Sequence, residues 1–173
     1  MVRMSDDKIK KEKLCIVLLW ILAILYFYFI SIHSSLSAEA SAKASRVIAK
    51  KAFSVVESVT ETVQMGDKKD VSYTSVLVFI RKSAHMINFY ILGFLYSMIA
   101  LKTNSQKELN VFAASIICGL LGAIIDESHQ IFVPGRGADI KDVYIDFIGV
   151  FWGCITLFVG LLVCKAEKYE RNK

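Results

Sequence analysis

The sequence of 173 residues contains very little proline, with Pro134 as its single example. It also carries little charge for its apolar content: 21% of residues are charged and 55% are hydrophobic, and the mean hydropathy is +0.50. These values do not fit an ordinary soluble domain of this size. The charged residues lie between apolar runs, so the net charge of +5 is typical of the basic flanks of membrane spans, and nucleic-acid binding is not expected.

The sequence also lacks the compact motifs of metal and disulfide sites. Its cysteines form no C-x-x-C pair, and all lie inside or at the edge of apolar runs, where a thiol behaves as a small hydrophobe: Cys15, Cys118, Cys154 and Cys164. We therefore expect neither a disulfide nor a cysteine-based metal site. A motif such as H-E-x-x-H is missing too, so the sequence assigns no metal ligand and no cofactor.

Four long apolar runs predict an all-α, polytopic membrane protein with four transmembrane helices, because a helix needs roughly 20 apolar residues to cross a bilayer. The predicted spans are residues 14–30, 83–101, 111–125 and 143–164. The third run is short, so a helix that crosses the bilayer there must also include polar residues at its ends. A short apolar run, 76–80, precedes the second span, and Arg81-Lys82 separates the two pieces.

The first apolar run has a secretory signal as its alternative interpretation, since lysines precede it and Ala38-Glu39-Ala40 follows it. The run is longer than the roughly 7–15 residues of a signal-peptide core, and this favours a retained span. We therefore divide the chain into a cytoplasmic tail (1–13), a four-span membrane domain (14–165) and a second cytoplasmic tail (166–173).

Between the first two spans, residues 37–65 show apolar residues at a spacing of three and four: Ala44, Ile48, Ala52, Val55, Val59 and Val63. This pattern predicts an amphipathic helix on the membrane surface or over the bundle, within an extracytoplasmic segment at 38–75. A solvated linker helix with one packed face is the alternative. Basic residues in the N-terminal tail and at the C-terminus favour cytoplasmic termini, although four basic residues between the first two spans argue against this orientation.

Four spans with this orientation put most of the polar residues of the spans, and all three histidines, at the outer surface. Helical spacing groups these residues, because positions three or four apart share a face: Arg81 with His85, and Asp126 with His129 and Gln130. Asp139, Asp142 and Asp146 form a third stripe. An ionisable group at membrane depth costs about 3 kcal/mol, so we expect these stripes to converge on one pocket.

These residues resemble those of the VanZ-like family of small membrane proteins. The resemblance rests on R-K-S-A-H at 81–85, on D-E-S-H-Q-I-F-V-P-G-R-G-A-D-I-K-D-V at 126–143, and on glycines 149 and 153 in the last span. The family pattern falls on Lys82, His85, Tyr90, Asp126, Glu127, Gln130, Arg136 and Asp142. The chain departs from it at Asp139, where a small hydroxyl residue is more common, and at Asp146, where Asn is usual.

Membership of this family, which is named for a teicoplanin-resistance protein, implies a bacterial plasma-membrane protein linked to glycopeptide resistance. Two readings of its polar residues follow. In the first, the pocket binds or modifies a phosphorylated or acidic envelope lipid or a glycopeptide, with catalytic roles for His85, Asp126 and Glu127 and ligand-binding roles for Arg81, Lys82, Gln130, Arg136 and Asp142. His129 is an alternative proton carrier, and a divalent ion held by histidine and carboxylates is an alternative mechanism.

In the second reading the protein is a non-catalytic membrane scaffold whose outer charges are structural. The cations are Arg81, Lys82, Arg136 and Lys141, and the facing carboxylates are Asp126, Glu127, Asp139, Asp142 and Asp146. This nearly balanced set can neutralise itself and fasten the outer loop to the spans. Asp139 and Asp142 also fit as an N-terminal cap and a first-turn acid of the last span.

Overall fold

The computed structural model describes residues 6–35, 43, 46–47, 50–51, 54, 73–103 and 108–171. Within this described part, all regular secondary structure is α-helical. The helices are α1 (Asp6–Ser34), α3 (Tyr73–Thr103), α4 (Glu108–Gln130) and α5 (Ile140–Arg171). All four are long and apolar enough to cross a membrane, which confirms the predicted four-span, all-helical class.

The helices extend beyond the apolar runs that predicted them. α3 continues without a break through Arg81 and Lys82, so the expected separation of residues 76–80 from the second span was wrong. A helix satisfies its backbone hydrogen bonds internally and therefore carries charged side chains near a span end without interruption. The predicted amphipathic helix at 37–65 falls largely outside the described residues and stays a prediction.

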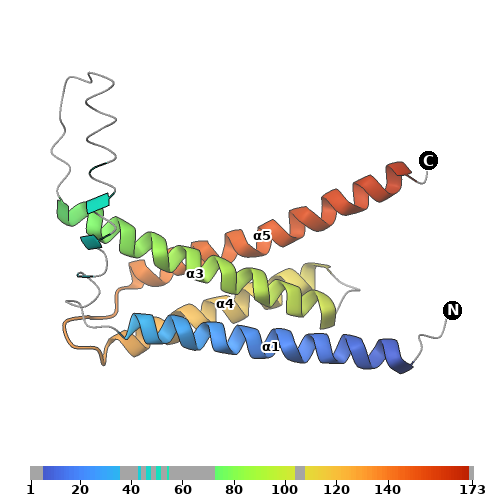
Figure 1. Cartoon of the computed structure of the whole chain (residues 1–173), viewed down its shortest axis with the longest axis horizontal. Helices are drawn as coiled ribbons and strands as arrows, with labels where there is room; N and C mark the ends of the chain where they lie inside the picture. The colour runs from blue at the N-terminus through green and yellow to red at the C-terminus, as the bar shows by residue number, and fades with distance from the viewer. Residues whose placement is uncertain are drawn as a thin grey trace, which may run out of the picture.

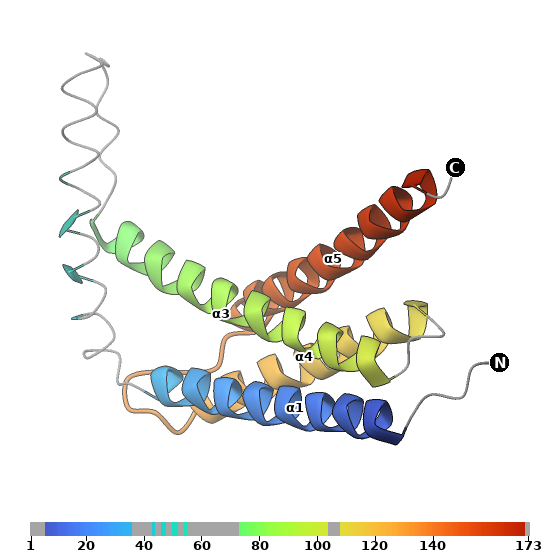
Figure 2. The same cartoon turned by 45° about the vertical axis from the view of Figure 1, so that its right-hand side comes forward.

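The interface between α3 and α5 is the most extensive in the bundle, and the N-terminal half of α5 crosses the middle of α3 (Figures 1 and 2). Glycines make this approach possible. A Cβ atom at Gly149 would collide with the carbonyl oxygen of Met86, and one at Gly153 with that of Tyr90. The Gly149-x-x-x-Gly153 spacing thus puts both glycines on the face of α5 that packs closely on α3.

The core lies around this crossing and includes residues from all four helices. Its fully buried members are Ile30, Phe89, Leu92, Ala123, Val150 and Cys154. α1 packs against α3 and α4 but exposes Leu18, Leu22 and Leu25 on its outer side, as expected for a helix that contacts lipid. The C-terminal half of α5 diverges from the other helices, and Leu162 and Val163 are exposed on it (Figures 1 and 2).

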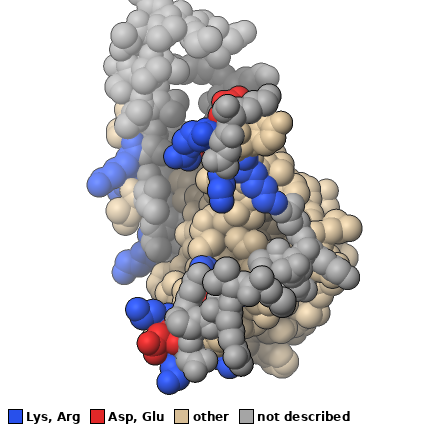
Figure 3. All heavy atoms as spheres, turned by 90° about the vertical axis from the view of Figure 1, so that its right-hand side faces the viewer, with Lys and Arg blue, Asp and Glu red and all other residues tan. Residues whose placement is uncertain are grey.

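The two ends of the bundle differ in charge. Both described termini lie at one end, and a view onto this end shows Lys and Arg side chains with few Asp or Glu (Figure 3). Exposed residues there include Lys10, Lys11, Lys13, Lys102, Lys168 and Arg171. The opposite end is formed by the last turns of α1 and α4, the first turns of α3 and α5, and the loop 131–139 between α4 and α5.

Candidate functional site

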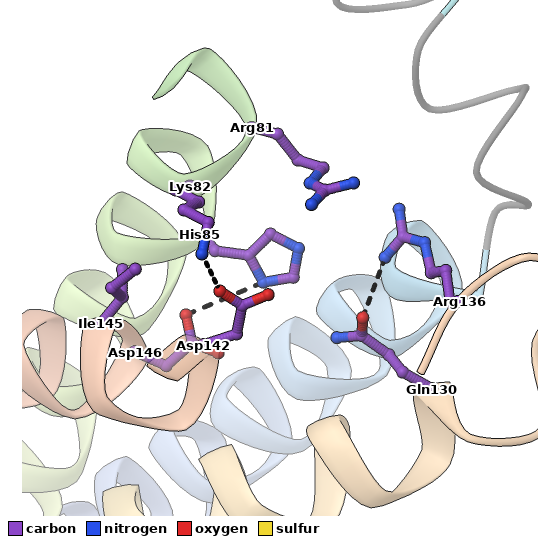
Figure 4. Close-up of a pocket in the computed structure, with 8 residues that line it drawn as sticks. All are labelled: Arg81, Lys82, His85, Gln130, Arg136, Asp142, Ile145 and Asp146. Atoms are coloured by element: carbon purple, nitrogen blue, oxygen red, sulfur yellow. Dashed lines mark hydrogen bonds and ion pairs between the residues drawn. The ribbon is translucent and has the colours of Figure 1, made fainter. Parts of the chain in front are cut away.

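A polar pocket lies at the end of the bundle opposite to the termini. Its enclosed cavity is small, about 10 Å³, which is room for roughly one water molecule, and it opens to solvent. Residues from α3, α4, α5 and the loop 131–139 line it: Arg81, Lys82, His85, Gln130, Arg136, Asp142, Ile145 and Asp146 (Figure 4). Six of the eight residues assigned to a site from the sequence therefore share this pocket.

Three side chains from three helices form a cluster at the pocket, termed the floor: His85 and Asp146 line the pocket, and the buried Asp126 does not. One ligand-type atom each of His85, Asp126 and Asp146 lies within 4.8 Å of the others. His85 Nδ1 is 3.7 Å from Asp146 Oδ1. Asp126 is 0% exposed and Asp146 is 1% exposed, so both carboxyl groups are removed from solvent. Burial of this kind is expensive unless the charges are compensated.

Two neighbours orient the carboxyl group of Asp126. The hydroxyl of Ser34, at the end of α1, donates a hydrogen bond of 2.8 Å to Asp126 Oδ2. The amide of Gln130, one turn along α4, donates to the same oxygen at 3.3 Å. Both bonds use one oxygen, which leaves Asp126 Oδ1 free to face the other members of the floor.

Several buried carboxyl oxygens of the floor and of the neighbouring residue Glu127 have no hydrogen-bond donor within the described part of the chain. They are Asp126 Oδ1, Glu127 Oε2 and both carboxyl oxygens of Asp146. Buried polar groups in folded proteins are nearly always hydrogen-bonded. The carboxylates of the floor therefore have capacity for a further cation or donor.

One rim of the pocket contains an ion pair. The ammonium group of Lys82 on α3 contacts the carboxylate of Asp142 in the first turn of α5. Both side chains are partly exposed, at 29% and 27%. This contact fastens α3 to α5 at the pocket and agrees with the structural reading for these two residues.

Arg81 and Arg136 face one another across the mouth of the pocket (Figure 4). Arg136 donates from Nη1 to Gln130 Oε1 at 3.2 Å, while its Nε is buried without an acceptor among the described residues. Burial, and then the charge of Arg81, lower the pKa of Arg136, and the carboxylates of Asp126, Glu127 and Asp142 act in the opposite direction. Within the described part, Arg81 forms neither an ion pair nor a hydrogen bond.

The loop 131–139 is held by a carboxylate on α4 and by a cap on α5. Glu127 Oε1 accepts a hydrogen bond of 2.6 Å from the backbone N–H of Asp139. The carboxylate of Asp139 in turn accepts from the N–H of Lys141 at 2.9 Å, as an N-cap does. Gly135 has a φ of 76°, a conformation that glycine adopts readily, and it follows Pro134 in this loop. Glu127 thus positions the loop that carries Arg136.

Two residues considered for the site lie outside the pocket. His129 is exposed and its Nδ1 lies 3.4 Å from the hydroxyl of Ser35. Tyr90 contributes its hydroxyl to Thr156 Oγ1 at 3.1 Å, between α3 and α5. Of the two histidines proposed as proton carriers, His85 is therefore the one that reaches the buried carboxylates.

The structure adds two residues that the sequence assignment did not include. Asp146 entered the sequence argument only as part of a helical stripe and as a departure from the family pattern, yet it forms the floor with His85. The spacing of four between Asp142 and Asp146 was the available signal. Ser34 offered none, since its contact with Asp126 joins residues 92 positions apart.

The fold and pocket define a multi-pass membrane protein with a buried histidine–carboxylate cluster at one end of its bundle. The model of the VanZ/LLP1 family matches residues 19–162 of the chain. Because the match covers most of the sequence and all of the pocket, the chain belongs to the VanZ/LLP1 family. No curated protein and no solved structure matches the chain.

Proposed function

We propose that this protein binds the phosphate or carboxylate group of an acidic cell-envelope component in its polar pocket. The observation that carries the proposal is the pair of guanidinium groups of Arg81 and Arg136, which face each other without carboxylate partners in the described part of the chain (Figure 4). Two like charges at a half-buried site repel one another, and an anion between them relieves the repulsion. Guanidinium forks suit bidentate contacts to phosphate and carboxylate oxygens.

The floor of the same pocket supports a role in proton transfer to or from the bound group. His85 approaches Asp146 at 3.7 Å and lines the pocket. A histidine held beside a carboxylate is a common general acid or base. In this proposal Arg81 and Arg136 hold the anion, Asp126 and Asp146 orient His85, and Glu127 fixes the loop that bears Arg136.

The proposal includes a location. The basic end of the bundle in Figure 3 fits the cytoplasmic side of a bacterial plasma membrane, because Lys and Arg are enriched on that side. The pocket then opens outside the cell, where it meets envelope lipids and their precursors. Family membership supports a link between this pocket and teicoplanin sensitivity.

The alternative function is a membrane scaffold, and the ion pair between Lys82 and Asp142 supports it. A scaffold would use its charges to fasten helices, as these two residues do. The scaffold function does not explain why Arg81 and Arg136 form no ion pair in the described part of the chain. In a scaffold whose charges neutralise one another, both arginines would be paired with carboxylates. The two functions therefore differ in what they predict for these arginines.

Native mass spectrometry of the full chain in detergent tests anion binding. The probes are phosphatidic acid, which exposes a phosphomonoester, and phosphatidylcholine with the same acyl chains. We expect adducts with phosphatidic acid at lower lipid concentration than with phosphatidylcholine, and about tenfold weaker binding in Arg81→Lys and Arg136→Lys. Lys141→Gln is the control, because Lys141 is exposed and does not line the pocket. Equal binding of both lipids by the wild type would contradict the proposal.

Cysteine labelling tests the orientation. In a background without the four native cysteines, single cysteines placed within residues 102–110 and 60–73 are treated in intact cells with an impermeant thiol reagent. We expect labelling of 60–73 only. Labelling of 102–110 instead would move the pocket to the cytoplasmic side.

A further inference from the structure

We infer that His85, Asp126 and Asp146 form a binding site for a divalent transition-metal ion of the Zn²⁺ or Mn²⁺ type. The three side chains come from α3, α4 and α5, and one ligand atom of each lies within 4.8 Å of the others. One imidazole nitrogen and two carboxylate oxygens are a common donor set for such ions. The site does not depend on the anion proposed for Arg81 and Arg136.

Burial provides a second and independent observation. Both carboxyl groups are almost fully buried, at 0% and 1% exposed, and three of their four oxygens have no hydrogen-bond donor in the described residues. In a purely structural cluster these oxygens would face donors, as Asp126 Oδ2 does toward Ser34. A divalent cation would compensate both charges at once.

The geometry permits metal binding after a small contraction. Bonds of about 2.1 Å place ligand atoms roughly 3–4.2 Å apart, somewhat closer than in the cluster. His85 and Asp146 line the pocket, which gives an ion a route to the floor.

The supporting contacts also fit a metal site. Metal-binding carboxylates are usually held by further hydrogen bonds. Ser34 and Gln130 hold Asp126 through Oδ2 and leave Oδ1 for the ion. Gln130 is itself bonded to Arg136, so the proposed ion and the mouth of the pocket share one hydrogen-bonded chain.

Metal titration of the purified full chain tests the site without any lipid probe. The protein is freed of metal with EDTA, and Zn²⁺, Mn²⁺ or Mg²⁺ is then added while bound metal is measured by elemental mass spectrometry and unfolding by thermal melting. We expect about one equivalent of Zn²⁺ or Mn²⁺ and a rise in Tm, because an ion that binds only the folded state stabilises it. Asp146→Asn and Asp126→Asn should abolish both effects, and His85→Gln should weaken binding at least tenfold.

Matched controls separate the site from general charge effects. Asp139→Asn removes the same charge from an exposed carboxylate, and His129→Gln removes an exposed imidazole, so both should bind metal like the wild type. A wild-type protein that binds neither Zn²⁺ nor Mn²⁺ overturns the inference, whatever the variants do. Unchanged metal binding in Asp126→Asn and Asp146→Asn overturns it as well. Lipid binding is measured separately, so either proposal can fail alone.

Discussion

The α3–α5 interface and the polar pocket share two helices but differ in how their atoms are packed: the pocket also includes residues of α4 and of the loop 131–139. At the interface, Gly149 and Gly153 bring backbone against backbone, and no space for a side chain remains. One to two turns away, at the pocket, buried oxygens of Asp126 and Asp146 lack donors. Helices that pack this closely at their centre do not leave polar atoms unpaired through loose packing. The unpaired atoms of the pocket are therefore a local feature of this end of the bundle.

The largest expected effect comes from breaking the interface. Gly149→Val would drive its side chain into the backbone of Met86, which cannot give way within a helix, and we expect a loss of roughly 3 kcal/mol or more in stability. Fluorescence-detected size-exclusion chromatography would show little folded protein. Gly160→Val on the same helix has open space around it and should leave folded protein near the wild-type amount. Equal yields from both variants would show that the close approach is not required.

A change in the pocket should affect function and leave the fold intact. Arg136→Lys keeps the charge but loses the two-pronged contact with oxygen atoms, so we expect normal membrane abundance, about tenfold weaker binding of phosphatidic acid, and greater teicoplanin sensitivity. Abundance by immunoblot and teicoplanin sensitivity are measured in the same cells. Full resistance with Arg136→Lys, together with low abundance for Arg136→Ala, would favour the scaffold function.

A smaller effect is expected where the pocket meets α1. Ser34→Ala removes the shorter of the two hydrogen bonds to Asp126 Oδ2 and leaves only the bond of 3.3 Å from Gln130 to this buried carboxylate. We expect a loss of about 1–2 kcal/mol in stability, measured by thermal or denaturant unfolding in detergent. Ser35→Ala is the control, since the hydroxyl of Ser35 is exposed and bonds to the carbonyl of Ser31. Equal losses of stability in the two variants would show that the hydrogen bond from Ser34 to Asp126 does not support the pocket.

The smallest effect should come from the rim. Lys82→Met or Asp142→Asn breaks the ion pair between α3 and α5, but both partners are partly exposed and the pair is screened by solvent. We expect a change below about 1 kcal/mol in unfolding free energy. The double variant should be no less stable than either single variant, because it leaves no unpaired charge. A loss as large as that of Gly149→Val would place the pair among the main supports of the fold.

The sequence alone determined the class of fold. A helix that spans a bilayer needs a long apolar segment, and such segments can be recognised directly in the sequence. It also indicated the cap at Asp139, because a cap depends on spacing along one segment. Helical spacing placed His85 and Asp126 among the candidate site residues.

Only the tertiary structure decided which candidates share a pocket and how they are paired. The bond between Ser34 and Asp126 and the approach of His85 to Asp146 join different helices, and their geometry depends on how each helix is rotated about its axis. That rotation is fixed by the packing of α3 on α5, and local sequence patterns do not contain it. For the same reason the sequence grouped His129 and Gln130 on one stripe, whereas in the fold Gln130 lines the pocket and His129 is exposed.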